Sequence, residues 1–141
     1  MSGTTCPVDH RRMPFRVLVV DDVAAFRDLA CRLLAGAGMQ VVGAVGTGAE
    51  AVAAARAGRP DVVLLDVQLA DTEGFAVCRA LCAEGFEVVL CSVRDERDFA
   101  GEVAACGARG FLPKHQLSAA ALLRLFASDR GNEIGRTDEG E

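Results

Sequence analysis

The feature that most constrains this chain is a set of polar residues that end four short apolar runs. Asp21 and Asp22 follow one run, and Asp66, Ser92 and Lys114 each follow another. Runs of this kind, separated by helical stretches, predict strands of a parallel sheet that is buried on both faces. Because the carboxyl ends of parallel strands form the ligand crevice of such sheets, we expect these five side chains to lie together.

Strand-like and helix-like segments alternate along the chain. Expected strands cover residues 15–20, 40–45, 61–65, 86–91 and 108–112. Expected helices cover 23–35, 47–58 with a capping box at its start, 73–84, 96–106 and 118–127. The buried stripe of the first helix should consist of Val23, Phe26, Ala30, Leu33 and Leu34. This order predicts an α/β fold with a doubly wound five-stranded parallel sheet, in which the first strand lies inside.

The same patterns divide the chain into three parts. We expect a disordered lead at residues 1–14, one domain at 15–127, and an acidic disordered tail at 128–141. No stretch after the last expected helix is long enough for a second domain. The sequence is therefore interpreted as a stand-alone domain.

Charge and cysteine usage exclude several classes of protein. A net charge of −5 argues against direct binding of nucleic acid or an anionic membrane surface. No apolar run approaches the ~20 residues of a membrane-spanning helix, and the first run ends in two aspartates, unlike a signal peptide. The six cysteines include no C-x-x-C pair. We interpret them as buried thiols of a cytoplasmic protein, with a metal site at Cys78 and Cys82 as the minor alternative.

The residue types at the strand ends indicate a specific chemistry. Clustered carboxylates repel one another unless a cation neutralises them, and Mg²⁺ is the cation best suited to oxygen ligands of this kind. Asp66, at the end of a separate strand, is the natural nucleophile toward phosphorus, with Lys114 and Ser92 placed to contact the phosphoryl oxygens. Taken singly, each residue has an ordinary explanation, such as a helix cap or a surface lysine. The joint pattern favours a site.

At these residues the chain resembles the receiver domain of two-component response regulators. The resemblance covers about residues 15–127 and lies in the motifs VLVVDD, VVLLDVQLADTEGF, VVLCSV and GARGFLPK. It implies a flavodoxin-like fold with strand order 2-1-3-4-5. It also implies that Asp22, Asp66 and the backbone carbonyl of Gln68 ligate Mg²⁺ directly, with Asp21 acting mainly through water. Phe111 stands where the family carries its switch aromatic.

The resemblance further implies a function. A partner histidine kinase or phosphotransfer protein would donate a phosphoryl group to Asp66, and Ser92 and Phe111 would then rearrange. The face formed by the helix 96–106, the strand 108–112 and the helix 118–127 would change shape as a signalling output. Homodimerisation on phosphorylation is left open. The chain would not be an enzyme beyond accepting and slowly hydrolysing its own phosphoryl group.

Two positions depart from the family pattern. Ala70 stands where a proline is common, in the loop after Asp66. His115 follows Lys114 where the family often has a proline, while Pro113 precedes the lysine, so the peptide geometry at 114–115 is left open.

Two residues at the rim of the expected site are assigned to the lifetime of the acyl phosphate. Gln68 and Arg94 each lie two residues beyond a site residue, so their side chains could reach the path of attacking water. The ordinary alternative for Arg94 is a solvent-facing side chain.

Three alternative functions predict different residues or a different use of the same site. A phosphatase with an aspartate nucleophile would carry a second aspartate at position 68, where this chain has Gln68. A flavin binder would need a phosphate loop after the first strand, where Asp21 and Asp22 would repel a phosphate. A receiver-like module that binds partners without phosphorylation is disfavoured by the complete site but remains the main alternative.

Overall fold

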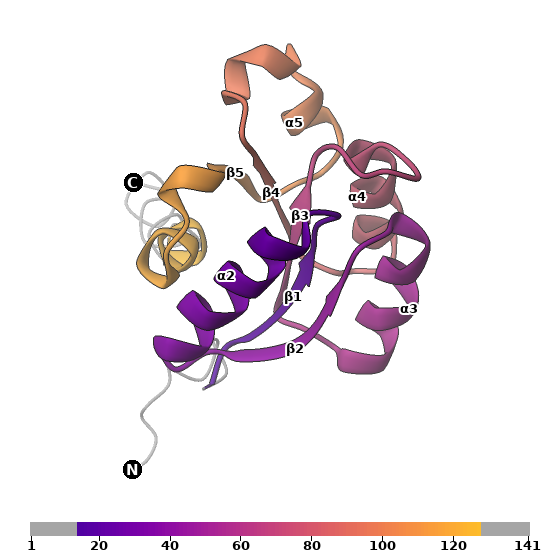
Figure 1. Cartoon of the computed structure of the whole chain (residues 1–141). Coiled ribbons are helices and arrows are strands. Elements are labelled where there is room, and N and C mark those ends of the chain that lie inside the picture. The colour runs from indigo at the N-terminus through magenta and orange to yellow at the C-terminus, as the bar shows by residue number, and fades with distance from the viewer. Residues whose placement is uncertain (1–13, 128–141) are drawn as a thin grey trace, which may run out of the picture.

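The computed structural model describes residues 14–127, which form a five-stranded all-parallel sheet with helices on both faces (Figure 1). The strands are β1 (Arg16–Val20), β2 (Gln40–Val45), β3 (Val62–Asp66), β4 (Val88–Ser92) and β5 (Gly110–Pro113). They are ordered β2-β1-β3-β4-β5. The predicted doubly wound fold and its strand order are therefore confirmed. The expected lead and tail lie outside the described residues, apart from Pro14.

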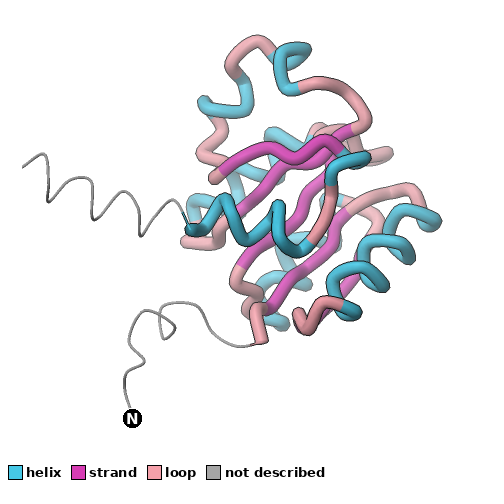
Figure 2. The backbone as a smooth tube through the Cα atoms, turned by 90° about the vertical axis from the view of Figure 1, so that its left-hand side faces the viewer, coloured by secondary structure: helices cyan, strands magenta, loops and turns pink. Residues whose placement is uncertain are grey.

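One face of the sheet is covered by α2 (Ala24–Gly36) and by a helix at residues 119–127 (Figure 2). Alternate residues of β1, Val17 and Val19, point into this layer, where they pack with Ala30, Leu34 and Leu122. Successive side chains of a strand point to opposite faces, so β1 contributes to two cores at once. This is why its sequence is apolar without interruption.

The other face is covered by α3 (Gly48–Gly58) and α4 (Gly74–Ala83), together with the segment that follows β4. Leu18 and Val20 of β1 point into this second core, against Ala51, Ala55 and Leu81. The capping box predicted at the start of α3 is present in a shifted form. Thr47 Oγ1 accepts from the Glu50 amide at 3.2 Å, while the Glu50 carboxylate accepts from the Gly46 amide at 3.3 Å.

The buried stripe predicted for α2 is too wide. Ala30 and Leu34 are fully buried, but Val23 and Leu33 are 48% and 41% exposed, and Phe26 is only half-buried. The helix contacts the sheet along a narrow line, so residues at the sides of the stripe stay at the surface. Leu29, which the stripe left out, is 44% exposed. The side of α2 next to the site therefore presents apolar side chains to solvent.

The continuous helix predicted at residues 96–106 is wrong. A 3₁₀ helix, η1 (Glu96–Phe99), is followed by a break at Ala100 and Gly101, and only Glu102–Ala105 form the α-helix α5. Both residues of the break have positive φ, 45° at Ala100 and 89° at Gly101. The capping pair Asp95 and Asp98 tightens the first turn, and the glycine then allows the left-handed backbone.

The cysteine pair of α4 consists of neutral thiols, of which Cys78 is buried and Cys82 is half-buried. Cys78 Sγ lies 3.9 Å from Cys82 Sγ, and each thiol also donates to a backbone carbonyl, that of Cys106 or Gly107. Burial raises the pKa of both thiols. The five described cysteines are free; Cys78, Cys91 and Cys106 are buried as predicted, whereas Cys31 and Cys82 are only half-buried.

Within residues 14–127, no helix is both long and apolar enough to cross a bilayer.

Candidate functional site

The register of the sheet brings the predicted residues to one level. Val20 pairs with Leu65, Asp66 pairs with Cys91, and Ser92 pairs with Pro113. The next residue along β1 is Asp21, and the next along β5 is Lys114, so four adjacent strands deliver their polar ends to the same edge. Asp66 and Ser92 prove to be the last residues of their strands rather than the first of their loops.

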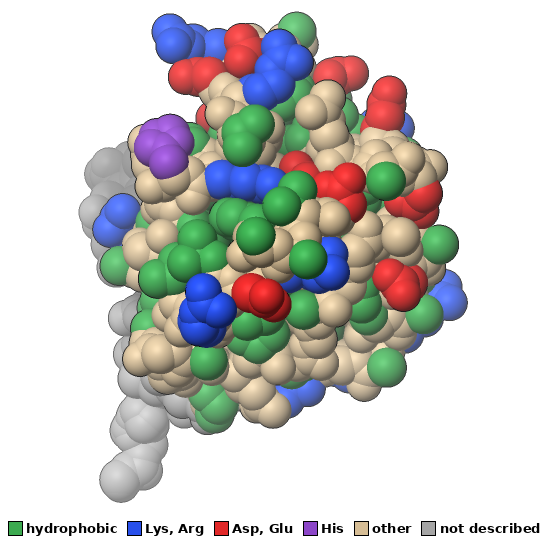
Figure 3. Space-filling view, in the orientation of Figure 1, with side chains coloured by type: hydrophobic (Ala, Val, Ile, Leu, Met, Phe, Trp, Pro, Cys, Tyr) green, Lys and Arg blue, Asp and Glu red, His purple; other side chains and the backbone are tan. Residues whose placement is uncertain are grey.

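Three carboxylates meet at this edge. One oxygen each from Asp21, Asp22 and Asp66 lies within 4.8 Å of the others. Asp21 and Asp66 are buried, with 1% and 7% of their surface exposed, while Asp22 is exposed. Figure 3 shows acidic and basic side chains gathered near this end of the sheet, with hydrophobic side chains over α2 below them.

Lys114 supplies the positive charge next to the carboxylates. Its Nζ lies 2.7 Å from Asp21 Oδ2 and 3.6 Å from Asp66 Oδ2, and only 12% of the side chain is exposed. Residues Lys114–Gln116 form a 3₁₀ turn directly after β5. On another side, the ammonium faces the ring of Phe26, 4.5 Å from its centroid.

Burial and crowding shift the ionisation of the site. Loss of solvent raises the pKa of Asp66 to about 6, with a further rise from Asp21, while Lys114 and the Gln68 amide act against it. Burial works to lower the pKa of Lys114, but the carboxylates of Asp21 and Asp66 outweigh it and leave this pKa raised. The one ammonium pairs with two of the three clustered carboxylates and does not neutralise the cluster.

The donor set fits a hard divalent cation. Asp21 Oδ2 is buried and accepts no well-directed hydrogen bond from the described residues, although its charge is balanced by the Lys114 ammonium. Carboxylate oxygens, with one exposed group that gives access from solvent, are the ligands that Mg²⁺ prefers. The chain thus has the ligands for a magnesium ion at this edge.

Ser92 and the two rim residues occupy different positions. Ser92 is buried, and its Oγ accepts from the Arg94 amide at 3.0 Å. The Arg94 side chain turns along its own segment, with Nε 3.6 Å from Asp98 Oδ2 and the guanidinium above the Phe99 ring. The backbone amide of Gln68 donates to Asp66 Oδ1 at 3.3 Å, but the Gln68 side chain is exposed.

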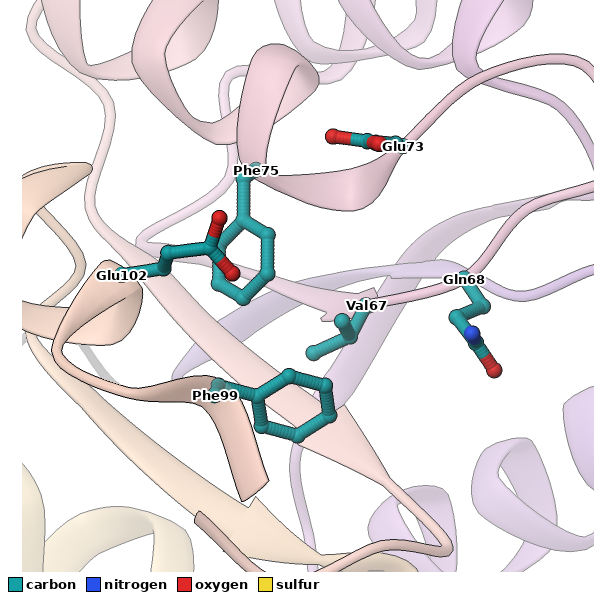
Figure 4. Close-up of a pocket in the computed structure, with 6 residues that line it drawn as sticks. All are labelled: Val67, Gln68, Glu73, Phe75, Phe99 and Glu102. Carbon is teal, nitrogen blue, oxygen red and sulfur yellow. The ribbon is translucent and has the colours of Figure 1, made fainter. Parts of the chain in front are cut away.

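An aromatic ladder runs from α4 to β5. Phe99 stacks edge-on against Phe75 at 5.6 Å and in a tilted arrangement against Phe111 at 5.8 Å. Phe111 is already buried, at 9% exposure, rather than poised at the surface to turn inward. A hollow of about 170 Å³ lies beside the ladder, lined by Val67, Gln68, Glu73, Phe75, Phe99 and Glu102 (Figure 4). In this view Phe75, Val67 and Phe99 turn toward one another, and Gln68 points away.

Sequence reasoning missed two residues that shape the site. Asp71, in the loop after Asp66, accepts from the Gly48 and Ala49 amides at 2.9 and 3.1 Å and so caps the start of α3. These hydrogen bonds lower the pKa of Asp71. Arg27 Nη1 donates to the Asp21 carbonyl at 2.6 Å and ties α2 to the loop after β1. The contact of Asp71 spans 23 residues and that of Arg27 spans six, and no sequence motif predicts either of them.

Comparison with known proteins agrees with this geometry. The model of the response regulator receiver domain matches residues 17–126. A protein-glutamate methylesterase/protein-glutamine glutaminase of Anaeromyxobacter dehalogenans is 39% identical over 118 residues, which cover 82% of this chain and 34% of that protein. The transcriptional regulatory protein TcrX of Mycobacterium tuberculosis is 37% identical over 131 residues, covering 90% of this chain and 55% of TcrX. The chain thus spans about a third to a half of these relatives.

Solved structures show the same fold. The signal receiver domain of NarL from Mycobacterium tuberculosis has a TM-score of 0.71 and 31% identity, and the match covers 81% of this chain and 98% of that domain. A CheX–CheY complex with beryllofluoride and Mg²⁺ from Borrelia burgdorferi also gives a TM-score of 0.71, at 22% identity, covering 82% of this chain and 89% of that one. From the family match and these relatives we conclude that the chain belongs to the response regulator receiver domain family.

Proposed function

We propose that this protein is a signalling switch that accepts a phosphoryl group on Asp66 from a histidine kinase or a phosphotransfer protein. The observation that carries the proposal is the position of Lys114 Nζ, between Asp21 and Asp66 at an edge where three carboxylates meet. That arrangement supplies a nucleophile, cation ligands and a fixed positive charge within one small volume. Each is needed when a phosphoryl group is transferred from a donor to an acceptor.

The residues divide the chemistry between them. An Asp66 oxygen attacks the phosphorus, the bond from phosphorus to the donor nitrogen breaks, and the electron pair leaves with the donor imidazole. Attack requires the ionised carboxylate, and a pKa of about 6 leaves most Asp66 ionised at neutral pH. Lys114 then pairs with a phosphoryl oxygen, and Ser92 Oγ donates to another. A Mg²⁺ ion held by Asp22, Asp66 and the Gln68 carbonyl, with Asp21 acting mainly through water, would neutralise charge on the phosphoryl group.

The output surface in this proposal is the segment from η1 to α5, together with β5 and the helix at 119–127. Ser92 is the last residue of β4, and the segment that follows it carries Phe99, which contacts Phe111 on β5. Movement of Ser92 toward a phosphoryl group therefore has a packed route to this face. Because Phe111 is already buried, the change is a shift between packed states rather than the filling of an empty space.

Two further assignments complete the proposal. We place the protein in the cytoplasm, because free thiols such as those of its described cysteines are typical of reducing compartments. We also keep Gln68 and Arg94 as residues that set the phosphoryl lifetime, although Arg94 must leave Asp98 to do so. Separate alanine variants should change the rate of phosphoryl hydrolysis severalfold, and unchanged decay in both would remove this role.

The test is incubation with a small phosphodonor and Mg²⁺, with the intact mass as readout. We expect a mass gain of one phosphoryl group that requires Mg²⁺ and is lost in Asp66→Asn. Asp28→Asn is the matched control, because Asp28 is an exposed aspartate of α2 that is not one of the three clustered carboxylates. Labelling of Asp66→Asn at the rate of the unchanged chain would overturn the assignment.

The alternative, partner binding without phosphorylation, makes a different prediction. Beryllofluoride with Mg²⁺ should slow hydrogen exchange around residues 96–106 and 111–127 if the site communicates with that face. In a module without a phosphoryl switch, exchange there would be unaltered even though the carboxylates bind the metal.

A further inference from the structure

Phe26 lies against the charged end of Lys114. The centroid of its ring is 4.5 Å from Lys114 Nζ, well inside the range in which an ammonium is attracted to the face of an aromatic ring. Phe26 belongs to the first turns of α2, which follows β1, whereas Lys114 follows β5, an edge strand. Because β1 and β5 are not neighbours in the sheet, the contact joins segments that strand pairing does not bring together.

The ring and the carboxylates enclose the ammonium from different sides. Asp21 Oδ2 and Asp66 Oδ2 lie 2.7 and 3.6 Å from Nζ, and the Phe26 ring covers a further side. The same two residues line an open hollow of about 590 Å³ with Val23, Leu29, Val93 and His115. Without the ring, more of the ammonium would be open to that hollow and would gain water.

Lysine needs such a constraint more than most side chains do. Its four-carbon stem is flexible and its ammonium is strongly hydrated, so an unrestrained Lys114 would spend part of its time turned into the hollow. The carboxylates alone do not fix it for catalysis, because one of them, Asp66, becomes an acyl phosphate when the phosphoryl group arrives. The contacts with Asp21 and with the Phe26 ring do not depend on the charge of the reacting group, and of these two partners only Phe26 also lines the hollow.

We propose that Phe26 is a positioning residue for phosphoryl acceptance, which holds the Lys114 ammonium over the carboxylates through a cation–π contact and shields it from solvent. For its kinetic consequence this inference rests on the function proposed above. Its structural consequence, a Lys114 ammonium protected from water, holds in the unphosphorylated chain.

The experiment replaces Phe26 with phenylalanines carrying one, two, three and five fluorine atoms. Fluorine withdraws charge from the ring face while nearly preserving its shape, so packing is kept and the cation–π attraction is weakened in steps. We expect the rate of labelling by a small phosphodonor to fall in the same steps, by about two- to fivefold at full fluorination. Exchange of the Lys114 ammonium protons with water, measured by NMR without donor, should accelerate in parallel.

Two substitutions by standard amino acids sharpen the result. Phe26→Tyr keeps an aromatic face and should label at nearly the original rate, whereas Phe26→Leu keeps only apolar bulk and should behave like the fully fluorinated chain. Leu29→Ala is the matched control, since Leu29 lines the same hollow one turn further along α2 and should leave both readouts unchanged.

The two proposals fail in different ways. If the unaltered chain takes no phosphoryl group, the proposed function is wrong, and the proton exchange of Lys114 alone decides the role of Phe26. Ammonium exchange that is independent of fluorination overturns the inference. So does a loss of labelling that follows the melting temperature through the series, or an equal loss in Leu29→Ala, because either would indicate packing rather than a contact with the charge.

Discussion

The strand ends and the segment after β4 are built in opposite ways. Asp21, Asp66 and Ser92 are buried at the ends of strands whose neighbouring residues are almost fully enclosed. Residues 93–101 begin with Val93, which is 76% exposed, and end at a break with two positive φ angles. The arginines of this segment form ion pairs with aspartates of the same segment, Arg94 with Asp98 and Arg97 with Asp95.

In the proposed function, this difference separates the region where phosphoryl transfer occurs from the region whose shape changes. Reacting groups must be held within a fraction of an ångström, which requires rigid, paired strands. A segment that responds must have two arrangements close in free energy, which requires few buried contacts. Phe99 is the connection between the regions, because it is buried between Phe75 and Phe111 but belongs to the loosely held segment.

The largest effect should come from Gly74→Ala, next to the rigid strand ends. Gly74 is the first residue of α4, and a methyl group there would lie 2.7 Å from the Val67 carbonyl oxygen and closer still to that of Asp66. The loop after Asp66 would have to move, which we expect to lower the free energy of unfolding by about 3 kcal/mol and to weaken Mg²⁺ binding. Denaturant unfolding measures the first effect. Gly36→Ala is the control, because a methyl group there meets nothing within 4 Å.

The next effect should come from the charge of Asp66 itself. Its folded pKa of about 6 lies above the ordinary 3.8, so the folded state prefers the neutral acid. The stabilisation is complete below the ordinary pKa and is lost as the pH rises through about 6. Without metal at pH 7.5, Asp66→Asn should therefore be more stable than the unaltered chain by about 1–2 kcal/mol, after allowance for solvent screening.

Thermal unfolding at several pH values checks this sign. The advantage of Asp66→Asn should vanish below about pH 4, where the unaltered chain carries a neutral acid. Saturating Mg²⁺ should also remove it, since the cation stabilises the ionised cluster. A variant that is less stable at every pH would show that Asp66 is not destabilised by its surroundings.

Within residues 93–101, Ala100→Gly should increase the stability of the folded chain. Ala100 has φ 45°, a conformation that costs an L-residue roughly 1–2 kcal/mol and a glycine almost nothing. Part of this gain is offset by the greater freedom of glycine in the unfolded chain, so we expect about 0.5–1 kcal/mol. Denaturant unfolding is the measurement, and Gly101→Ala, at φ 89°, should have the opposite effect.

The smallest and most local effect should come from Asp71→Ala, which removes a cap without touching the carboxylate cluster. Amide exchange at Gly48 and Ala49 should accelerate, because both donors lose their partner. The pKa of Asp71 is lowered in the folded state, so its contribution is present above the ordinary pKa and lost as the pH falls. Asp71→Asn, which keeps one acceptor oxygen, should retain part of the protection. Unaltered exchange in both variants would contradict the role of this cap.

Sequence reasoning located the strand ends better than the surfaces around them. The strands are buried on both faces, so their apolar runs are uninterrupted, and the polar residue that ends each run is conspicuous. The prediction of one continuous helix at 96–106 was wrong. Most of its residues favour a helix individually, but Asp98 and Gly101 together stabilise a tight turn and a left-handed break. The stripe of α2 failed because periodicity indicates which side of a helix is apolar but not how much of that side a neighbour covers.

The sequence by itself determined the fold, the strand order that its family resemblance implies, and the set of residues at the carboxyl edge. It did so because a parallel sheet brings its strand ends together whatever the loops contain. Only the tertiary structure decided the contacts made across the sheet order: Lys114 between Asp21, Asp66 and the ring of Phe26, and Asp71 on the start of α3. These contacts depend on the directions of side chains that start from distant elements, and a one-dimensional pattern holds no information about those directions.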